Sequence, residues 1–247
     1  MNPSRPHLFG LLAGLFLATG LCLASLVLAR AWTRIAESSA INVTGSAHKN
    51  VHSDLAVWHA AFSVDAPTLL EAQQQLRGDL TKVTAFLNAR GLTEFTLQPV
   101  QIREITAKRP EENNEDSLVT VRIGYRLTQA LEVRSTEVDR LPRLAGETGE
   151  LLQQSVAFVS TDMQFIYTKA GDAKIEMMAE ATKDARIRAE QIATQGGGAI
   201  RELRAAKMGV VQINPLYSSS TSWEGNNDNS SLDKTITATV TATFALK

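Results

Sequence analysis

The chain has 247 residues, with 25 basic and 26 acidic side chains and a formal net charge of −1 at neutral pH. This length can bury a sizeable core in one large domain or two small ones. The balanced charge argues against binding of nucleic acid through bulk electrostatic attraction. The single cysteine, Cys22, excludes an intramolecular disulfide framework.

The N-terminal segment Leu8–Leu28 contains no charged side chain. As an α-helix it would be about 31 Å long, which matches a bilayer core of about 30 Å. A cleaved signal peptide is an alternative interpretation, because the small residues on either side of Arg30 fit a cleavage site weakly. The length of the apolar segment favours a retained single-pass anchor. The basic residues on its two sides nearly balance, so the orientation rests on the short N-terminal tail. We expect an inner-membrane protein whose C-terminal domain lies in the periplasm.

Two strands are predicted after the anchor. The first is Ile41–Ala47, and the second is Leu55–Asp65, which is apolar on both parities and therefore typical of a central strand. The polar stretch Ala47–Asp54 between them predicts a turn, so the two strands are expected to form a hairpin.

A helix is predicted over Pro67–Arg90. Thr68 lies three residues before Glu71, which is the pattern of a capping box, and apolar residues follow at helical spacing. Gly91 marks the expected end of this helix.

A third strand is predicted over Glu94–Ile105, with a bulge or an edge position at Pro99, which cannot donate to a strand ladder. The charged stretch Lys108–Asp116 then predicts a hairpin loop.

The clearest strand signal is Val119–Arg134. Apolar residues fall mainly on one parity and polar residues on the other, which predicts a half-buried strand of an antiparallel sheet. At about 3.3 Å per residue it would run about 50 Å, far beyond an ordinary strand. The strand is therefore bent near Gly124 or Gln129, or a large structure is built on it.

The next segments predict a helix over Thr136–Gln153 that breaks around Gly146–Gly149, and a strand over Phe158–Tyr167. A long helix follows over Asp172–Gln195. Its predicted buried stripe consists of residues at helical spacing, namely Ile175, Met178, Thr182, Ala185, Ala189 and Ile192.

The C-terminal part predicts two more strands. Ile200–Ile213 is the first, and Lys234–Leu246 is the second, where apolar residues alternate with threonines. The polar, low-complexity stretch Pro215–Leu232 between them predicts a mobile loop.

The predicted order is β-β-α-β-β-α-β-α-β-β after the transmembrane helix. Paired strands separated by single helices indicate an α+β fold, with antiparallel sheets of long strands covered by two long helices. We divide the chain into an anchor, residues 1–34, and one α+β domain, residues 35–247.

Four weak motifs in this order resemble the SIMPL-domain family of bacterial envelope proteins. They are INVTGSA, TLLEAQQQL, VRIGYRLTQALEVR and ATKDARIRAEQIATQGGG, and the likeness covers Ile41–Leu246. The chain departs from the family pattern at His48–Asp54 and Val156–Tyr167. The resemblance implies an envelope location, self-association into large rings in some members, and a link to oxidative-stress tolerance. It implies no catalytic residues.

Three histidines, His48, His52 and His59, lie close together in the sequence. On a helix, the spacing of the first two would direct both at one metal ion. They fall in the predicted hairpin instead, and no cysteine or carboxylate cluster completes a site. We therefore interpret them as surface histidines and expect no metal.

Arg122, Arg126 and Arg134 fall on the polar parity of the long strand. They form a possible interaction face for an anion or for the carboxylates of a partner. A solvated sheet face, with cross-strand pairs to residues such as Glu94 or Glu104, is the simpler interpretation.

No Gly-x-Ser-x-Gly turn is present, and the glycine run Gly196–Gly198 follows a helix and lacks the features of a phosphate-binding loop. The leading hypothesis is therefore a non-enzymatic, membrane-anchored envelope protein that binds no cofactor and no nucleic acid. Its expected partners are the membrane, through Leu8–Leu28, and further copies of itself in a homo-oligomeric ring. The alternative is a periplasmic ligand-binding or metal-binding protein, or a hydrolase.

Overall fold

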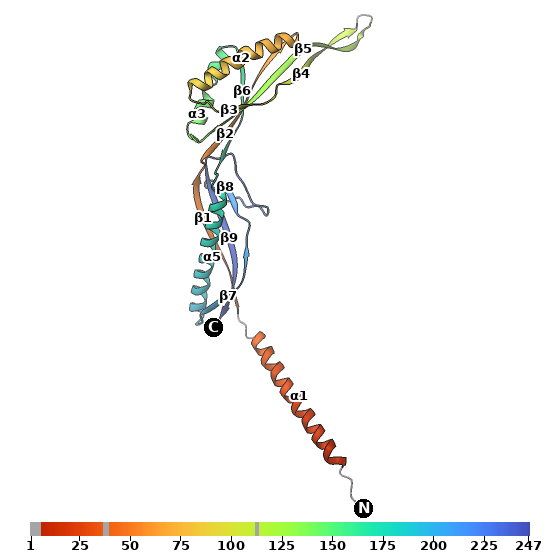
Figure 1. The fold of residues 1–247 in the computed structure, drawn as a ribbon, viewed down its shortest axis with the longest axis vertical. Coiled ribbons are helices and arrows are strands. Elements are labelled where there is room, and N and C mark those ends of the chain that lie inside the picture. The colour runs from red at the N-terminus through yellow and green to blue at the C-terminus, as the bar shows by residue number, and fades with distance from the viewer. Residues whose placement is uncertain (1–5, 37–39, 112–113) are drawn as a thin grey trace, which may run out of the picture. The chain divides into compact units, whose positions relative to one another are not determined.

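The structure is a computed structural model that describes residues 6–36, 40–111 and 114–247 (Figure 1). Two compact units can be distinguished in it. Unit 1 comprises Met1–Ala47, Met178–Gly209 and Ala238–Lys247, and unit 2 comprises His48–Met177 and Val210–Thr237. The fold is α+β with antiparallel sheets, as the order of predicted elements indicates.

Helix α1 spans Pro6–Ala36 and contains the predicted anchor. Within it, the 23 residues Gly10–Trp32 are long and apolar enough to cross a membrane. This confirms an apolar N-terminal helix of membrane-spanning length. A signal sequence would satisfy the same criteria of length and composition.

A four-stranded sheet has the order β1-β9-β7, and β8 also pairs with β9. Its strands are β1 (Ala40–His52), β7 (Ile200–Met208), β8 (Gln212–Pro215) and β9 (Asp233–Leu246). The predicted strand Ile200–Ile213 is thus divided into β7 and β8. In β9 the apolar residues are buried on alternate positions, which confirms the predicted alternation.

Helix α5 (Ala170–Gln195) buries a stripe of alanines in unit 1, and these alanines pack with residues of β1 and β9. The predicted stripe is right at Ala185 and Ala189 but wrong at Ile175 and Ile192, which are 65% and 55% exposed. The physical reason is the spacing between helix and sheet, which only small side chains permit. The buried stripe of unit 1 consists of residues four apart: Ala181, Ala185, Ala189 and Ala193.

Gly45 of β1 shows how close this approach is. A Cβ atom added to Gly45 would clash with the Ala181 carbonyl oxygen and the Ala185 amide nitrogen, and would lie 2.8 Å from the Ala185 Cα atom. The backbone of β1 therefore rests directly on the backbone of α5, and a glycine is needed at this position.

The five-stranded sheet of unit 2 has the order β3-β5-β2-β6, and β4 also pairs with β5. Its strands are, in chain order, β2 (Leu55–Ala66), β3 (Phe95–Leu97), β4 (Gln101–Glu111), β5 (Asn114–Ser135) and β6 (Ala157–Ile166). The central position predicted for Leu55–Asp65 is confirmed, because β2 lies between β5 and β6.

The hairpin predicted for the first two strands is wrong. β1 pairs with β9, whereas β2 pairs with β5 and β6. The polar residues after Ala47 extend β1 as far as His52 instead of forming a turn. The chain then changes sheets at Ser53 and Asp54, whose amide groups donate to the carbonyl oxygens of Leu232 and Ile166 at 2.9 and 3.0 Å.

Strand β5 has 22 residues, which confirms the unusual length. It pairs with β2 only from Tyr125 to Ser135, and with β4 along most of its length. The β4–β5 register shifts at Gly124, one of the two positions where a bend is expected, and a Cβ on Gly124 would lie 2.8 Å from the Ala66 carbonyl oxygen. The part of the β4–β5 pair that precedes Gly124 in β5 has no β2 beside it. It continues as a projecting two-stranded ribbon (Figure 1).

Three helices, α2 (Leu69–Ala89), α3 (Leu141–Gly146) and α4 (Gly149–Gln153), contribute to the core of unit 2. The predicted cap of α2 is confirmed, since the Thr68 hydroxyl accepts from the Glu71 amide at 3.3 Å. Trp58 is fully buried in this core and donates from Nε1 to the Ser160 hydroxyl at 2.8 Å. A polar partner for the indole is what burial of a tryptophan requires.

Candidate functional site

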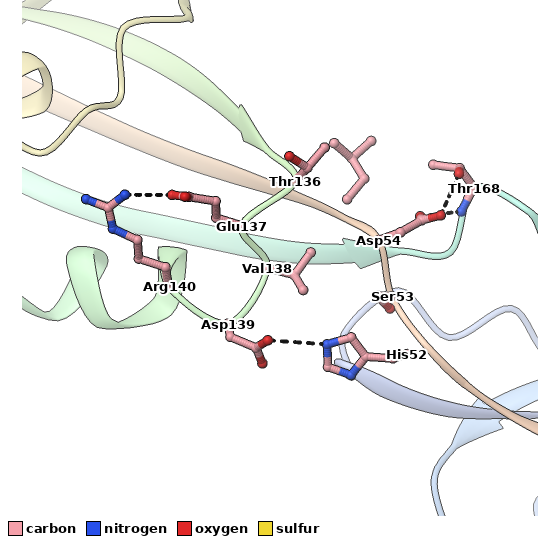
Figure 2. A pocket seen from close by; sticks show the side chains of 10 residues that line it. His52, Ser53, Asp54, Thr136, Glu137, Val138, Asp139, Arg140 and Thr168 are labelled. Atoms are coloured by element: carbon pink, nitrogen blue, oxygen red, sulfur yellow. Dashed lines mark hydrogen bonds and ion pairs between the residues drawn. The ribbon is translucent and has the colours of Figure 1, made fainter.

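A hollow of about 770 Å³ opens beside the junction between β1 and β2 (Figure 2). Its walls come from the β1–β2 junction, from the segment between β5 and α3, and from the residues after β6. The lining residues are His52, Ser53, Asp54, Leu55, Thr136, Glu137, Val138, Asp139, Arg140 and Thr168.

Asp54 fixes one wall of this hollow. Its carboxylate accepts from the Thr168 amide at 2.7 Å and from the Thr168 hydroxyl at 2.8 Å. Partial burial raises the pKa of Asp54, but the hydrogen bonds from Thr168 outweigh it, and the pKa lies below its ordinary value. The Asp54 carboxylate therefore links the start of β2 to the segment that follows β6.

His52 lies between two carboxylates. Its Nδ1 atom is 2.7 Å from Asp233 Oδ1, and its Nε2 atom is 3.6 Å from Asp139 Oδ2. The hydrogen bond to Asp233 raises the pKa of His52 above its ordinary value, and the charge of Asp139 adds to this. The geometry favours an imidazolium that bridges the two acids.

Arg140 and Glu137 form the opposite wall (Figure 2). Arg140 Nη1 donates to Glu137 Oε2 at 2.7 Å, and Nη2 donates to the carbonyl oxygen of Arg90 at 2.9 Å. Both side chains also line a second hollow of about 510 Å³, which Arg134 borders. Neither hollow is lined by Arg122 or Arg126.

The only hydroxyl oxygen that is buried without a hydrogen-bond partner in the described part of the chain is Ser53 Oγ. Nucleophilic catalysis needs a hydroxyl or thiol within hydrogen-bond reach of a base. His52 is instead engaged by Asp233, and the Thr168 hydroxyl donates to Asp54. Within residues 6–36, 40–111 and 114–247, no group of three or more His, Cys, Asp or Glu side chains is placed to hold a metal ion. The ionisable side chains at this hollow are thus engaged by partners within the chain.

The three arginines of the predicted interaction face are each paired within the chain. Arg122 Nη1 lies 3.2 Å from Glu104, the cross-strand partner that the sequence suggests, and Arg134 Nε lies 2.6 Å from Glu132. Arg126 binds Asp65 through two hydrogen bonds of 2.7 and 2.6 Å. These bonds lower the pKa of Asp65 and raise the pKa of Arg126. All three side chains stay more than half exposed, so a role in binding partners stays a prediction.

The histidines do not come together. His48 is exposed on β1, and His59 on β2 lies 3.9 Å from Glu132. Only His52 belongs to the hollow, and sequence reasoning did not single it out from the others. Its partner Asp233 lies 181 residues away in the chain, so no local spacing could have indicated the pair.

A sequence model of SIMPL, described as a protein of unknown function (DUF541), matches residues 41–244. The chain belongs to the SIMPL family. No curated protein matches it. The match confirms the resemblance carried by the four sequence motifs, and the SIMPL region includes every residue of the His52 hollow.

The bridging histidine makes the stability of the SIMPL region depend on pH. Because the folded-state pKa of His52 is raised, its stabilisation is complete below about pH 6.5 and is lost as the pH rises through the raised value. His52→Gln should therefore destabilise the protein at about pH 5.5, by up to about 1 kcal/mol after allowance for solvent screening, and have a smaller effect at about pH 8.5. Thermal unfolding at both pH values measures this.

His48→Gln is the matched control, because His48 is exposed and has no ion pair or hydrogen bond in the structure. It should leave the melting temperature unchanged at both pH values. An equal loss at both pH values for His52→Gln would contradict the imidazolium bridge.

Proposed function

We propose that this SIMPL protein is a non-enzymatic, membrane-anchored envelope protein that assembles with copies of itself. Helix α1 would hold it in the inner membrane, with residues 35–247 in the periplasm. The membrane-spanning length of Gly10–Trp32 supports the anchor, and the family assignment supports the envelope location. The link to oxidative-stress tolerance stays a prediction, since it rests on the family resemblance alone.

The observation that carries the proposal is the ribbon beyond Gly124, which we call the arm: residues 106–111 of β4 and 114–123 of β5. An isolated two-stranded ribbon is at best marginally stable in water. On the side of β5 away from β4, β2 pairs no further than Tyr125. The backbone groups on that edge of the arm are therefore available to another strand.

The arm also carries apolar side chains that the chain does not cover. Leu118 is 62% exposed, Ile123 is 47% exposed and Val119 is 37% exposed. The register shift at Gly124 contributes to this, because it breaks the simple alternation of the strand. Arg122 and Tyr125 fall on opposite parities, yet the Arg122 guanidinium lies 5.0 Å from the Tyr125 ring centroid. Exposed apolar residues on an open strand edge indicate an association surface.

A second copy of the chain offers a complementary edge. Strand β6 is the terminal strand of the five-stranded sheet in the described chain, and Val159 on it is 61% exposed. Pairing of the arm of one copy with β6 of the next would use two different surfaces. Such a heterologous contact repeats from copy to copy and closes into a ring when the rotation allows it.

The test is the double variant Leu118→Glu and Ile123→Glu in the full chain, solubilised in detergent. Both side chains are exposed, so the substitutions should leave the fold of a single copy intact. Charges at these positions should oppose burial between copies, and the particle mass should fall towards that of one chain, 26.8 kDa.

The matched control is the double variant Ile175→Glu and Ile192→Glu, which places the same charges on exposed isoleucines of α5. It should keep the wild-type particle mass. The arm is not the assembly surface if its own variant keeps that mass while remaining folded by circular dichroism.

A further inference from the structure

The segment between β8 and β9, residues 216–232, is held from inside by side chains, although its composition predicts a mobile loop. Gln212 on β8 is buried, and both the nitrogen and the oxygen of its side-chain amide form hydrogen bonds with the segment. Its Nε2 atom donates to the Ser222 carbonyl oxygen at 2.7 Å, and its Oε1 atom accepts from the Asn226 amide at 2.8 Å. We call this segment the β8–β9 loop.

A second buried amide repeats this arrangement. Asn214 Nδ2 donates to the Ser220 carbonyl oxygen at 2.7 Å, and Asn214 Oδ1 accepts from Asn226 Nδ2 at 2.8 Å. At the other end of the loop, the buried Lys234 ammonium donates to the carbonyl oxygen of Asp228 at 2.7 Å. The backbone of the loop is therefore held at several points between Ser220 and Asp228 by groups that are removed from water.

This fixed loop carries two aromatic side chains into solvent. Tyr217 is 93% exposed and Trp223 is 85% exposed. Tyr217 has a φ of +67°, a left-handed conformation that is costly for a bulky residue. Aromatic side chains normally bury about 150–250 Å² each, so two on one ordered loop indicate a surface that meets a flat apolar partner.

Residues of the same loop also line two hollows that are rich in polar groups. A hollow of about 400 Å³ is lined by Asn214, Ser218, Ser220 and Asn226, among others, and Asn227 and Asp228 border both this hollow and a second one of about 350 Å³. The Asn227 side chain is exposed and makes no hydrogen bond in the described structure. It can both donate to and accept from a ligand.

The loop itself carries few exposed charges. Asp228 is neutralised by Lys234, with 3.2 Å between Nζ and Oδ2, which leaves Glu224 as the one charge of the loop that is exposed and lacks an ion pair in the structure. A nucleic acid or a phosphate ligand would require exposed cations. A stable protein partner would require about 800 Å² on this side, more than two aromatic side chains supply.

We propose that the β8–β9 loop binds a neutral glycan. A pyranose ring has an apolar C–H face that can stack on Trp223 or Tyr217, and a rim of hydroxyl groups that match the amide of Asn227 and the serine hydroxyls. The pre-formed backbone lowers the ordering cost of binding. This inference goes beyond the proposed assembly and does not depend on it.

The test uses the full chain in detergent, with two neutral hexasaccharides as probes, one built from glucose and one from N-acetylglucosamine. Isothermal titration should show saturable binding of at least one probe. Trp223→Ala should weaken that binding at least about tenfold, and Trp223→Phe, which keeps an aromatic face, should weaken it less. Both variants should keep the wild-type melting temperature, because Trp223 is exposed.

Glu224→Gln is the control for charge and should leave the affinity unchanged. Sedimentation with insoluble polysaccharides of the same two sugars distinguishes a polymeric from a soluble glycan ligand. A polymeric ligand is indicated if the protein sediments with the polysaccharide, and a soluble ligand if only the hexasaccharides bind. Absence of saturable binding of either probe, or equal affinity of Trp223→Ala and wild type, would overturn the proposal. Particle mass is a separate readout, and Trp223→Ala should not alter it.

Discussion

Replacing Gly45 by valine should lower the melting temperature of the solubilised protein by about 6–12 °C. The valine Cβ would clash with the Ala181 carbonyl oxygen and the Ala185 amide nitrogen, which are backbone atoms of α5 and cannot rotate away. Strand β1 and helix α5 would have to separate. We expect a loss of about 3 kcal/mol, at the upper end of the range for overpacked sites, and each kcal/mol corresponds to about 2–4 °C for a chain of this size.

Gly78→Ala is the matched control. Gly78 lies inside α2, is exposed, and has no atom within 4 Å of the position that a Cβ would take. Alanine is preferred over glycine in a helix interior, so this variant should gain up to about 1 kcal/mol. A Gly45→Val protein that melts with wild-type stability would show that β1 does not rest on α5 as described.

Removing the Asp228 carboxylate should lower the free energy of unfolding by a similar amount. The side chains of Lys234 and Asp228 are only 1% and 10% exposed. Asp228→Ala would leave the Lys234 ammonium buried without its counter-charge, which typically costs about 3–5 kcal/mol. The double variant Asp228→Ala and Lys234→Met should recover much of this loss, because it removes both charges. Thermal unfolding of the two variants at neutral pH measures the difference.

The acid dependence of the same pair provides a second readout. Burial raises the pKa of Asp228, but hydrogen bonds from Ser230, Ser231 and Lys234 outweigh it and lower the pKa to about 2. The stabilisation is therefore complete above about pH 4 and is lost as the pH falls through about 2. The difference in free energy of unfolding between wild type and Asp228→Ala should decrease as the pH falls from about 4 to about 2. A difference that stays constant would contradict the lowered pKa of Asp228.

The elements with strong local signals could be predicted from the sequence. The capping box at Thr68 defines the start of α2, and alternation identifies β9 and most of β5. Alternation does not say which strand is the neighbour, however. β1 and β2 are consecutive in the chain, yet β1 pairs with β9 from the C-terminal end. The hairpin prediction failed because it assumed that sequential strands pair.

The buried face of α5 was mispredicted for a related reason. Hydrophobicity favours Ile175 and Ile192 over the alanines, but the distance between a helix and a sheet depends on both partners. The need for small side chains becomes visible only when Gly45 is seen against Ala181 and Ala185. Periodicity gives the spacing of the buried residues along a helix, whereas the surface that the helix packs against determines which set of residues is buried.

The candidate site depends even more on long-range contacts. The pairing of Arg122 with Glu104 could be anticipated, because both lie on one predicted strand pair. The His52–Asp233 pair and the buried amides under the β8–β9 loop join distant segments and have no sequence signature. A serine- and asparagine-rich stretch has the composition of a mobile loop whether or not buried side chains hold it.

The central claim is self-assembly, and the mass of the wild-type full chain in detergent at micromolar concentration tests it most directly. Light scattering coupled to size exclusion, with the detergent contribution subtracted, gives that mass. Self-assembly predicts a single species at a multiple of 26.8 kDa that appears as a closed particle by electron microscopy. A species with the mass of one chain across that concentration range would contradict it.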